Sequence, residues 1–121
     1  MSSSIMMVSL RVPDHVMDDC RDYYTALGLD VNSSDVDIGH KMLKRIILPC
    51  QSFLLEIVES GKADEYLTPP AVIGIRTDLS QDEAFRELGR RGFQAHKTNY
   101  DGLPGISSVD PGGIKLMIRT N

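Results

Sequence analysis

The order of predicted secondary-structure elements repeats within the chain, and this repeat limits the possible folds more than any other feature. Each half is predicted to form a strand, a helix and three further strands. The segment "LRVPD" corresponds to "IRTD", which aligns Arg11 with Arg76, and offsets of roughly 60 to 65 residues recur. The sequence therefore predicts a single α+β domain with tandem βαβββ modules. We place this domain at 1–121, its modules at 5–58 and 71–119, and a linker at 59–70.

Both predicted helices have recognisable starts. The first lies within 14–27, where Asp14 is a candidate N-cap and apolar residues recur at helical spacing. Its tyrosines, Tyr23 and Tyr24, are expected to pack in the core. The second helix begins with the S-x-x-E capping box at 80–83, in which the serine and glutamate side chains satisfy first-turn backbone donors.

The segment "SSVDPGGIKLMIRT" (107–120) predicts two strands joined by a tight turn. Its "DPGG" supplies the fixed and the positive φ values that a chain reversal needs. The strand after it alternates, with apolar residues on one face and a methionine between two cations on the other: Ile114, Leu116 and Ile118 against Lys115, Met117 and Arg119. The first face is expected to be core, which leaves open what Met117 contacts.

Composition limits the partners of this chain. The formal net charge is −4, and basic clusters are confined to "KMLKR" and "GRRG", so nucleic acid is not expected as a partner. No apolar run approaches the ~18 residues of a membrane span, and "MSSSIMMVSL" lacks the pattern of a signal peptide. We therefore expect no membrane partner and a cytoplasmic location. The two cysteines lack metal-ligand spacing, so neither zinc nor a disulfide is expected, and Cys20 is predicted to be a reduced core thiol.

The repeat and several segments together resemble the vicinal oxygen chelate superfamily, which includes glyoxalase I, the bleomycin- and fosfomycin-resistance proteins and the extradiol dioxygenases. The likeness covers roughly residues 5–119. It implies that the modules curl their sheets into an open cup, and that short chains of this kind form homodimers. The segments with the likeness are "VSLRVPDHVMDDCRDYYTALGLDV", "FLLEIVE", "VIGIRTDLSQDEAFRELGRRGF" and "SVDPGGIKLMI".

In enzymes of that superfamily, four strand positions on the cup floor hold a divalent metal, usually through His, Glu or Gln. The resemblance places these positions at Met7, Glu56, Val72 and Met117. One carboxylate beside two thioethers and a valine is a poor set of ligands for a hard divalent ion, so we expect neither a metal nor a cofactor. The three histidines fall elsewhere and are expected at the surface: His15, His40 and His96.

Strand alternation independently predicts the side chains that line the cup. The floor is apolar and adaptable because of its methionines, Gly74 leaves room for a ligand, and two arginines lie nearer the rim. This lining suits a largely apolar ligand with an anionic group. The expected ligand-binding residues are Met7, Ser9, Arg11, Leu54, Glu56, Val72, Gly74, Arg76, Lys115 and Met117.

Two of these residues have alternative roles. Arg11 would bind a carboxylate if it acts as the corresponding arginine of glyoxalase-like sequences does, or it forms a structural salt bridge, with Glu56 or another acid. Glu56 would be a general base if its apolar surroundings raise its pKa, or it is a paired carboxylate with no chemical role.

Two functions follow from these alternatives. The first is a metal-independent small-molecule-binding protein of the glyoxalase and bleomycin-resistance type. The second is an enzyme: a metal-free isomerase or lyase with Glu56 as catalytic base, or a glyoxalase-like lyase or dioxygenase-like enzyme if the four ligand positions are assigned out of register. We rank binding first, because a single candidate base without an acid partner is thin support for catalysis.

Overall fold

The computed structural model describes residues 6–50, 53–59 and 72–121. Within these residues the elements follow the predicted order, and each module has one helix among its strands. The first module consists of β1 (Met6–Val12), α1 (Met17–Ala26), β2 (Asn32–Ile38), β3 (Lys41–Pro49) and β4 (Phe53–Glu59). The second consists of β5 (Ile73–Arg76), α2 (Gln81–Arg90), β6 (Ala95–Tyr100), β7 (Leu103–Val109) and β8 (Lys115–Arg119).

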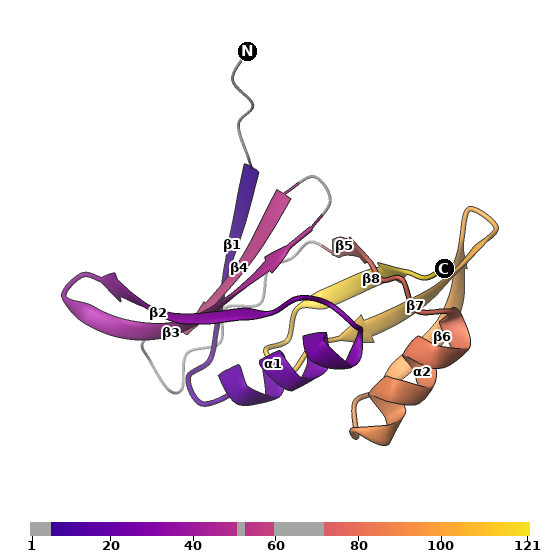
Figure 1. Cartoon of the computed structure of the whole chain (residues 1–121), viewed down its shortest axis with the longest axis horizontal. Helices are drawn as coiled ribbons and strands as arrows, with labels where there is room; N and C mark the ends of the chain where they lie inside the picture. Colours follow the sequence, from indigo (N-terminus) through magenta and orange to yellow (C-terminus); the bar gives the residue numbers. More distant parts are fainter. Residues whose placement is uncertain (1–5, 51–52, 60–71) are drawn as a thin grey trace, which may run out of the picture.

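Each module forms a four-stranded mixed sheet with the same topology. The strand orders are β1-β4-β3-β2 and β5-β8-β7-β6. In each sheet the first strand runs parallel to the last, and the other neighbours are antiparallel. Figure 1 shows both helices on one side of the two sheets. The predicted repeat and the α+β class are therefore confirmed. Residues 60–70 of the predicted linker (59–70) lie outside the described residues, so its role stays a prediction.

One hydrophobic core fills the space between the helices and the sheets and joins both modules. It includes Tyr23 and Tyr24 of α1, Leu88 of α2 and strand residues of both sheets. In β8 the predicted alternation is confirmed, since Leu116 and Ile118 are buried while Lys115, Met117 and Arg119 are exposed. Cys20 is buried in the same core, as predicted, and burial raises the pKa of its thiol.

The predicted start of the first helix is wrong. Helix α1 begins at Met17, and its N-cap residue, Val16, makes no side-chain capping hydrogen bond. The chain turns sharply at His15, which has a φ of 67°, so Asp14 lies too early to cap the helix. The capping box of α2 is confirmed: Ser80 Oγ accepts from the Glu83 amide, and the Glu83 carboxylate accepts from the Ser80 amide.

The "DPGG" turn joins the second module to the first. Oδ1 of Asp110 accepts hydrogen bonds of 2.9 Å from the amides of Gly112 and Ile114, while Oδ2 accepts one from Tyr24 of α1. A Cβ on Gly112 would lie 2.3 Å from Val12 Cγ1 at the end of β1. Glycine is needed here because the turn backbone packs directly against β1.

Neither helix in the described parts of the chain has the length and apolar composition that a membrane span requires.

Candidate functional site

The predicted ligand-binding residues lie on the helix-free faces, by which we mean the faces of the two sheets opposite those that pack in the helix-covered core. Three apolar members are prominent at the surface: Met7 is 47% exposed, Val72 54% and Met117 36%. Met117 therefore contacts solvent in the isolated chain. The structure divides the ten residues between the two sheets: Met7, Ser9, Arg11, Leu54 and Glu56 in the first, and Gly74, Arg76, Lys115 and Met117 in the second, with Val72 immediately before β5.

Strand register brings the first group together. β1 and β4 run parallel, which pairs Met7 with Leu54 and Ser9 with Glu56. Residues paired in this way, and those two positions further along, share a face of the sheet. The first module therefore presents an apolar pair beside a polar pair on its helix-free face.

The surroundings of Glu56 differ from the expectation of an isolated carboxylate among apolar side chains. Its Oε1 accepts a hydrogen bond of 2.6 Å from Ser9 Oγ, and its Oε2 forms an ion pair of 3.0 Å with Nη1 of Arg45. The Glu56 side chain is 13% exposed and that of Arg45 is 27% exposed, so the pair is largely screened from water. Both carboxylate oxygens thus have partners, and the salt-bridge partner is Arg45.

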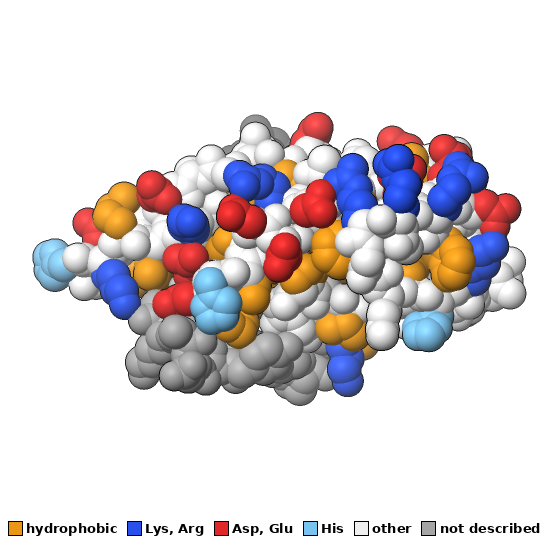
Figure 2. Space-filling view, turned by 90° about the horizontal axis from the view of Figure 1, so that it is seen from below, with side chains coloured by type: hydrophobic (Ala, Val, Ile, Leu, Met, Phe, Trp, Pro, Cys, Tyr) orange, Lys and Arg blue, Asp and Glu red, His pale blue; other side chains and the backbone are white. Residues whose placement is uncertain are grey.

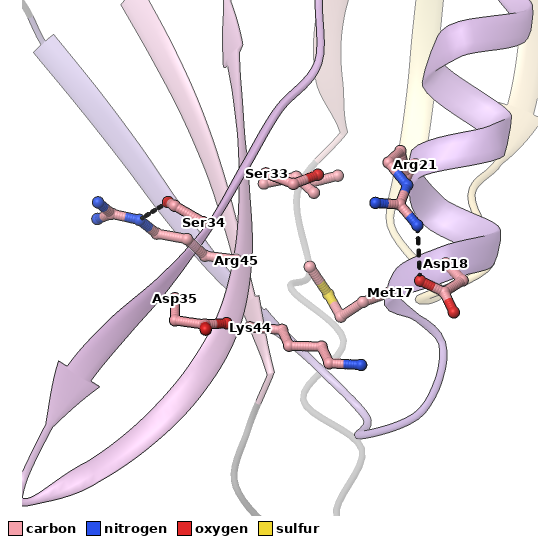
Figure 3. Close-up of a pocket in the computed structure, with 9 residues that line it drawn as sticks. Met17, Asp18, Arg21, Ser33, Ser34, Asp35, Lys44 and Arg45 are labelled. Atoms are coloured by element: carbon pink, nitrogen blue, oxygen red, sulfur yellow. Dashed lines mark hydrogen bonds and ion pairs between the residues drawn. The ribbon is translucent and has the colours of Figure 1, made fainter.

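Arg45 is the functional candidate that sequence reasoning missed. It lies on β3, where its Nε donates a hydrogen bond of 2.9 Å to Ser34 Oγ of β2. Figure 3 shows the side chains of Arg45 and Ser34 directed away from α1. We call the linked residues Ser9, Ser34, Arg45 and Glu56 the Arg45 cluster. The signal for it was the alternation of "KMLKRIILP", which places Arg45 and Ile47 on one face, but alternation does not name a cross-strand partner.

Arg11 lies beside this cluster without joining it. Its Nη1 donates a hydrogen bond of 3.0 Å to the carbonyl oxygen of Glu59. Arg11 and Arg45 are both paired with Val58 of β4, one from each side, and Val58 is fully buried between them. The structure therefore gives Arg11 a backbone partner and no ion pair with Glu56.

A cleft of about 470 Å³ lies where the two modules meet. Two predicted ligand-binding residues, Gly74 and Arg76, line it. Arg11 does not line this cleft. The cleft reaches β4 at Phe53, which pairs with Met6 of β1, and Arg11 lies five residues further along β1, about 16 Å away at the rise of a strand. The other lining residues are Gly28, Leu29, Pro49, Cys50, Phe53, Ile75 and Asp78.

A second cleft, of about 320 Å³, lies between α1 and the β2–β3 hairpin (Figure 3). Charged and apolar side chains both line it. Asp18 and Arg21 form an ion pair of 2.8 Å on one side, Asp35 and Lys44 lie opposite each other in the register of β2 and β3, and Met17 and Ile46 are apolar. Figure 2 shows the molecule from below, where acidic and basic side chains are interspersed. The apolar side chains expected to bind a ligand, Met7, Val72 and Met117, line neither cleft.

Solved structures of similar fold cover nearly the whole chain. A putative glyoxalase family protein from Bacillus anthracis matches with a TM-score of 0.69 at 16% identity, covering 100% of this chain and 97% of that one. The fosfomycin resistance protein FosX of Listeria monocytogenes, an E126Q mutant complexed with Mn(II) and a dihydroxypropylphosphonic acid, matches with 0.67 at 15%, covering 98% and 93%. Lactoylglutathione lyase from Agrobacterium tumefaciens matches with 0.62 at 16%, covering 99% and 95%. The chain has the vicinal oxygen chelate fold. No protein-family profile and no curated protein sequence matches it.

The residues at the metal positions implied by the vicinal oxygen chelate fold do not fit a divalent ion. Met7, Val72 and Met117 offer no oxygen or imidazole ligand, and Glu56 is already bound by Arg45 and Ser9. Among the described residues, no group of three or more His, Cys, Asp or Glu side chains is arranged to hold a metal. The histidines are exposed, as predicted: His15, His40 and His96.

Proposed function

We propose that this chain is a metal-independent small-molecule-binding protein that holds a largely apolar, anionic ligand on its helix-free faces. The main support is the state of Glu56. The single carboxylate among the four implied metal positions is neutralised by Arg45 and bonded to Ser9, which leaves no hard ligand for an ion.

The exposed apolar side chains of the helix-free faces favour an apolar ligand. Met7, Val72 and Met117 are 36–54% exposed. An apolar molecule that covers these side chains removes apolar surface from water, which is favourable. Methionine adapts its shape to irregular ligands at low cost. The arginines on these faces, Arg11 and Arg76 among them, supply positive charge for an anionic group.

Binding is a better explanation than catalysis by Glu56. A general base needs a carboxylate oxygen directed at the proton that it removes. Here each oxygen of Glu56 already accepts a hydrogen bond from a neighbouring strand, and the Arg45 guanidinium stabilises the negative charge in place. The arrangement fits a structural or ligand-holding carboxylate.

Thermal denaturation in EDTA tests this function. We expect straight-chain carboxylates of six to ten carbons to raise the melting temperature, because a ligand that binds the native state stabilises it by mass action. The alcohols of equal length are the matched controls and should raise it less. Stabilisation that appears only after a divalent metal is added would contradict the proposal.

A homodimer and a cytoplasmic location remain part of the proposal. Light scattering after size-exclusion chromatography tests the homodimer, for which a mass of about twice 13.4 kDa is expected.

A further inference from the structure

The guanidinium of Arg45 is held rigidly on two sides. Its Nε donates to Ser34 and its Nη1 to Glu56, at 2.9 and 3.0 Å. Guanidinium is planar and has five N–H donors in a fixed arrangement. Among the described residues no partner accepts from Nη2, although the side chain is 27% exposed. One edge of a fixed cation is therefore free to bind a ligand.

Among the described residues, positive charge exceeds negative charge around this edge. Arg11 and Arg45 are both paired with Val58, and neighbouring strands lie about 5 Å apart, so their Cα atoms are about 10 Å apart. Two side chains of this length can reach a single anion between them. Glu56 is the one carboxylate bound to either guanidinium among the described residues, since Arg11 bonds a carbonyl and the Glu59 carboxylate accepts from the Lys44 amide.

Apolar side chains lie further along the same face, beyond the polar Ser9–Glu56 pair. Met7 and Leu54 form the next pair on the same face beyond Ser9 and Glu56, and they lie about 13 Å from the Arg11–Val58 pair at the rise of a strand. A molecule with an anionic head at Arg45 would therefore lay its apolar tail over Met7 and Leu54.

We propose that Arg45, fixed by Glu56 and Ser34, is the anion-binding centre of the helix-free face and binds the carboxylate of an apolar monoanion through Nη2. The proposal rests on the function proposed above and specifies its ligand contact. A guanidinium differs from a metal ion in its chemistry: it binds anionic oxygens by charge and N–H donation and has no open coordination position. Arg45 would thus bind an anionic oxygen through Nη2, and it does not activate neutral oxygens as a metal ion does.

Nuclear magnetic resonance of the ¹⁵N-labelled whole chain tests the proposal, with octanoate as the probe and EDTA present. We expect a saturable shift of the Arg45 Nε–Hε signal and of amide signals in β1, β3 and β4. Glu56→Gln should tighten octanoate binding, because it removes the carboxylate that competes for Arg45. The double variant Arg45→Gln/Glu56→Gln should bind at least about tenfold more weakly than Glu56→Gln.

A matched control is available on α2. Arg90 and Glu87 form an exposed ion pair of 2.7 Å, so Arg90→Gln/Glu87→Gln makes the same chemical change away from the face and should leave octanoate binding unchanged. Urea denaturation of each variant verifies that it folds, and glutamine at both positions of the Arg45 cluster retains hydrogen-bonding capacity.

The experiment distinguishes failure of the Arg45 proposal from failure of the proposed function. If the double variant binds octanoate as tightly as Glu56→Gln, or if octanoate shifts the signals of Gly74 and Arg76 while Arg45 Nε–Hε stays fixed, the Arg45 proposal is overturned and metal-independent binding stands. If octanoate shifts signals only after a divalent metal is added, both proposals fall.

Discussion

The hydroxyl of Tyr24 donates a hydrogen bond of 2.5 Å to Oδ2 of Asp110, and both residues are buried. This bond joins α1 of the first module to the turn between β7 and β8 of the second. Burial, with the nearby charge of Asp110, raises the pKa of Tyr24 well above its usual value, so the phenol stays a neutral donor. The bond is a buried polar link between the modules, and a second one is donated by Thr77 Oγ1 to the carbonyl oxygen of Leu27.

We expect Tyr24→Phe to lower the free energy of unfolding by about 1.5–3 kcal/mol, because it removes a buried hydrogen bond to a charged acceptor. Urea denaturation at pH 7 measures the change. Tyr23→Phe is the matched control. The hydroxyl of Tyr23 is buried and makes no hydrogen bond within the described residues, although Ser108, which donates to the Gln94 carbonyl, lies near it. An equal loss in both variants would contradict a specific role for Tyr24.

Asp110 should make stability depend on pH in an unusual direction for a carboxylate. Burial raises its pKa above the ordinary value of 3.8, although bonds from Tyr24 and the backbone amides counteract part of the rise. The native state therefore binds this proton more tightly than the unfolded state does. The contribution of Asp110 is greatest below pH 3.8 and is lost as the pH rises through the native pKa.

Comparison of the wild type with Asp110→Asn isolates this contribution. The advantage of the wild type over the variant, measured by urea denaturation in steps from pH 3 to pH 7, should decrease as the pH rises. An advantage that grows with pH would show that the hydrogen bonds, rather than burial, dominate the titration of Asp110.

The two halves of the Arg45–Glu56 pair should respond unequally to neutralisation. Arg45→Gln leaves Glu56 largely buried without its cation and should cost about 1–3 kcal/mol of unfolding free energy. Glu56→Gln keeps one acceptor oxygen for Arg45 and an amide group that can donate to Ser9 Oγ, and the more exposed Arg45 retains some hydration, so this change should cost less. Urea denaturation of both single variants and the double variant measures the asymmetry. Equal costs would contradict it.

Gly112→Ala should destabilise the protein by about 1–3 kcal/mol, because its Cβ would lie 2.3 Å from Val12 Cγ1 and the turn would have to move. Gly89→Ala in α2 is the contrasting control. Nothing lies within 4 Å of its Cβ position, and alanine is favoured over glycine within a helix by about 0.5–1 kcal/mol. The melting temperature should therefore fall in Gly112→Ala and rise in Gly89→Ala. An unchanged melting temperature in Gly112→Ala would show that Val12 and the end of β1 move aside at little cost.

Local patterns in the sequence were sufficient for the fold. The alternation in "GIKLMIRT" determined which face of β8 is buried, because side chains of a strand alternate strictly whatever lies around them. The capping box at Ser80 determined the start of α2 because both of its hydrogen bonds join residues three apart. The doubled order of elements predicted two βαβββ modules, and each observed sheet consists of the strands of one module.

Only the tertiary structure decided the partners of the charged groups. Glu56 pairs with Arg45 because the antiparallel register of β3 and β4 places Arg45 opposite Val58 and Ile47 opposite Glu56, and no local pattern specifies that register. Asp110 meets Tyr24 across 86 positions of the chain only because two modules share one core. Asp14, a good N-cap by composition, loses that role to the backbone turn at His15. Alternation determines the face on which a side chain lies, whereas the docking of separate strands and helices determines which charge stands next to it.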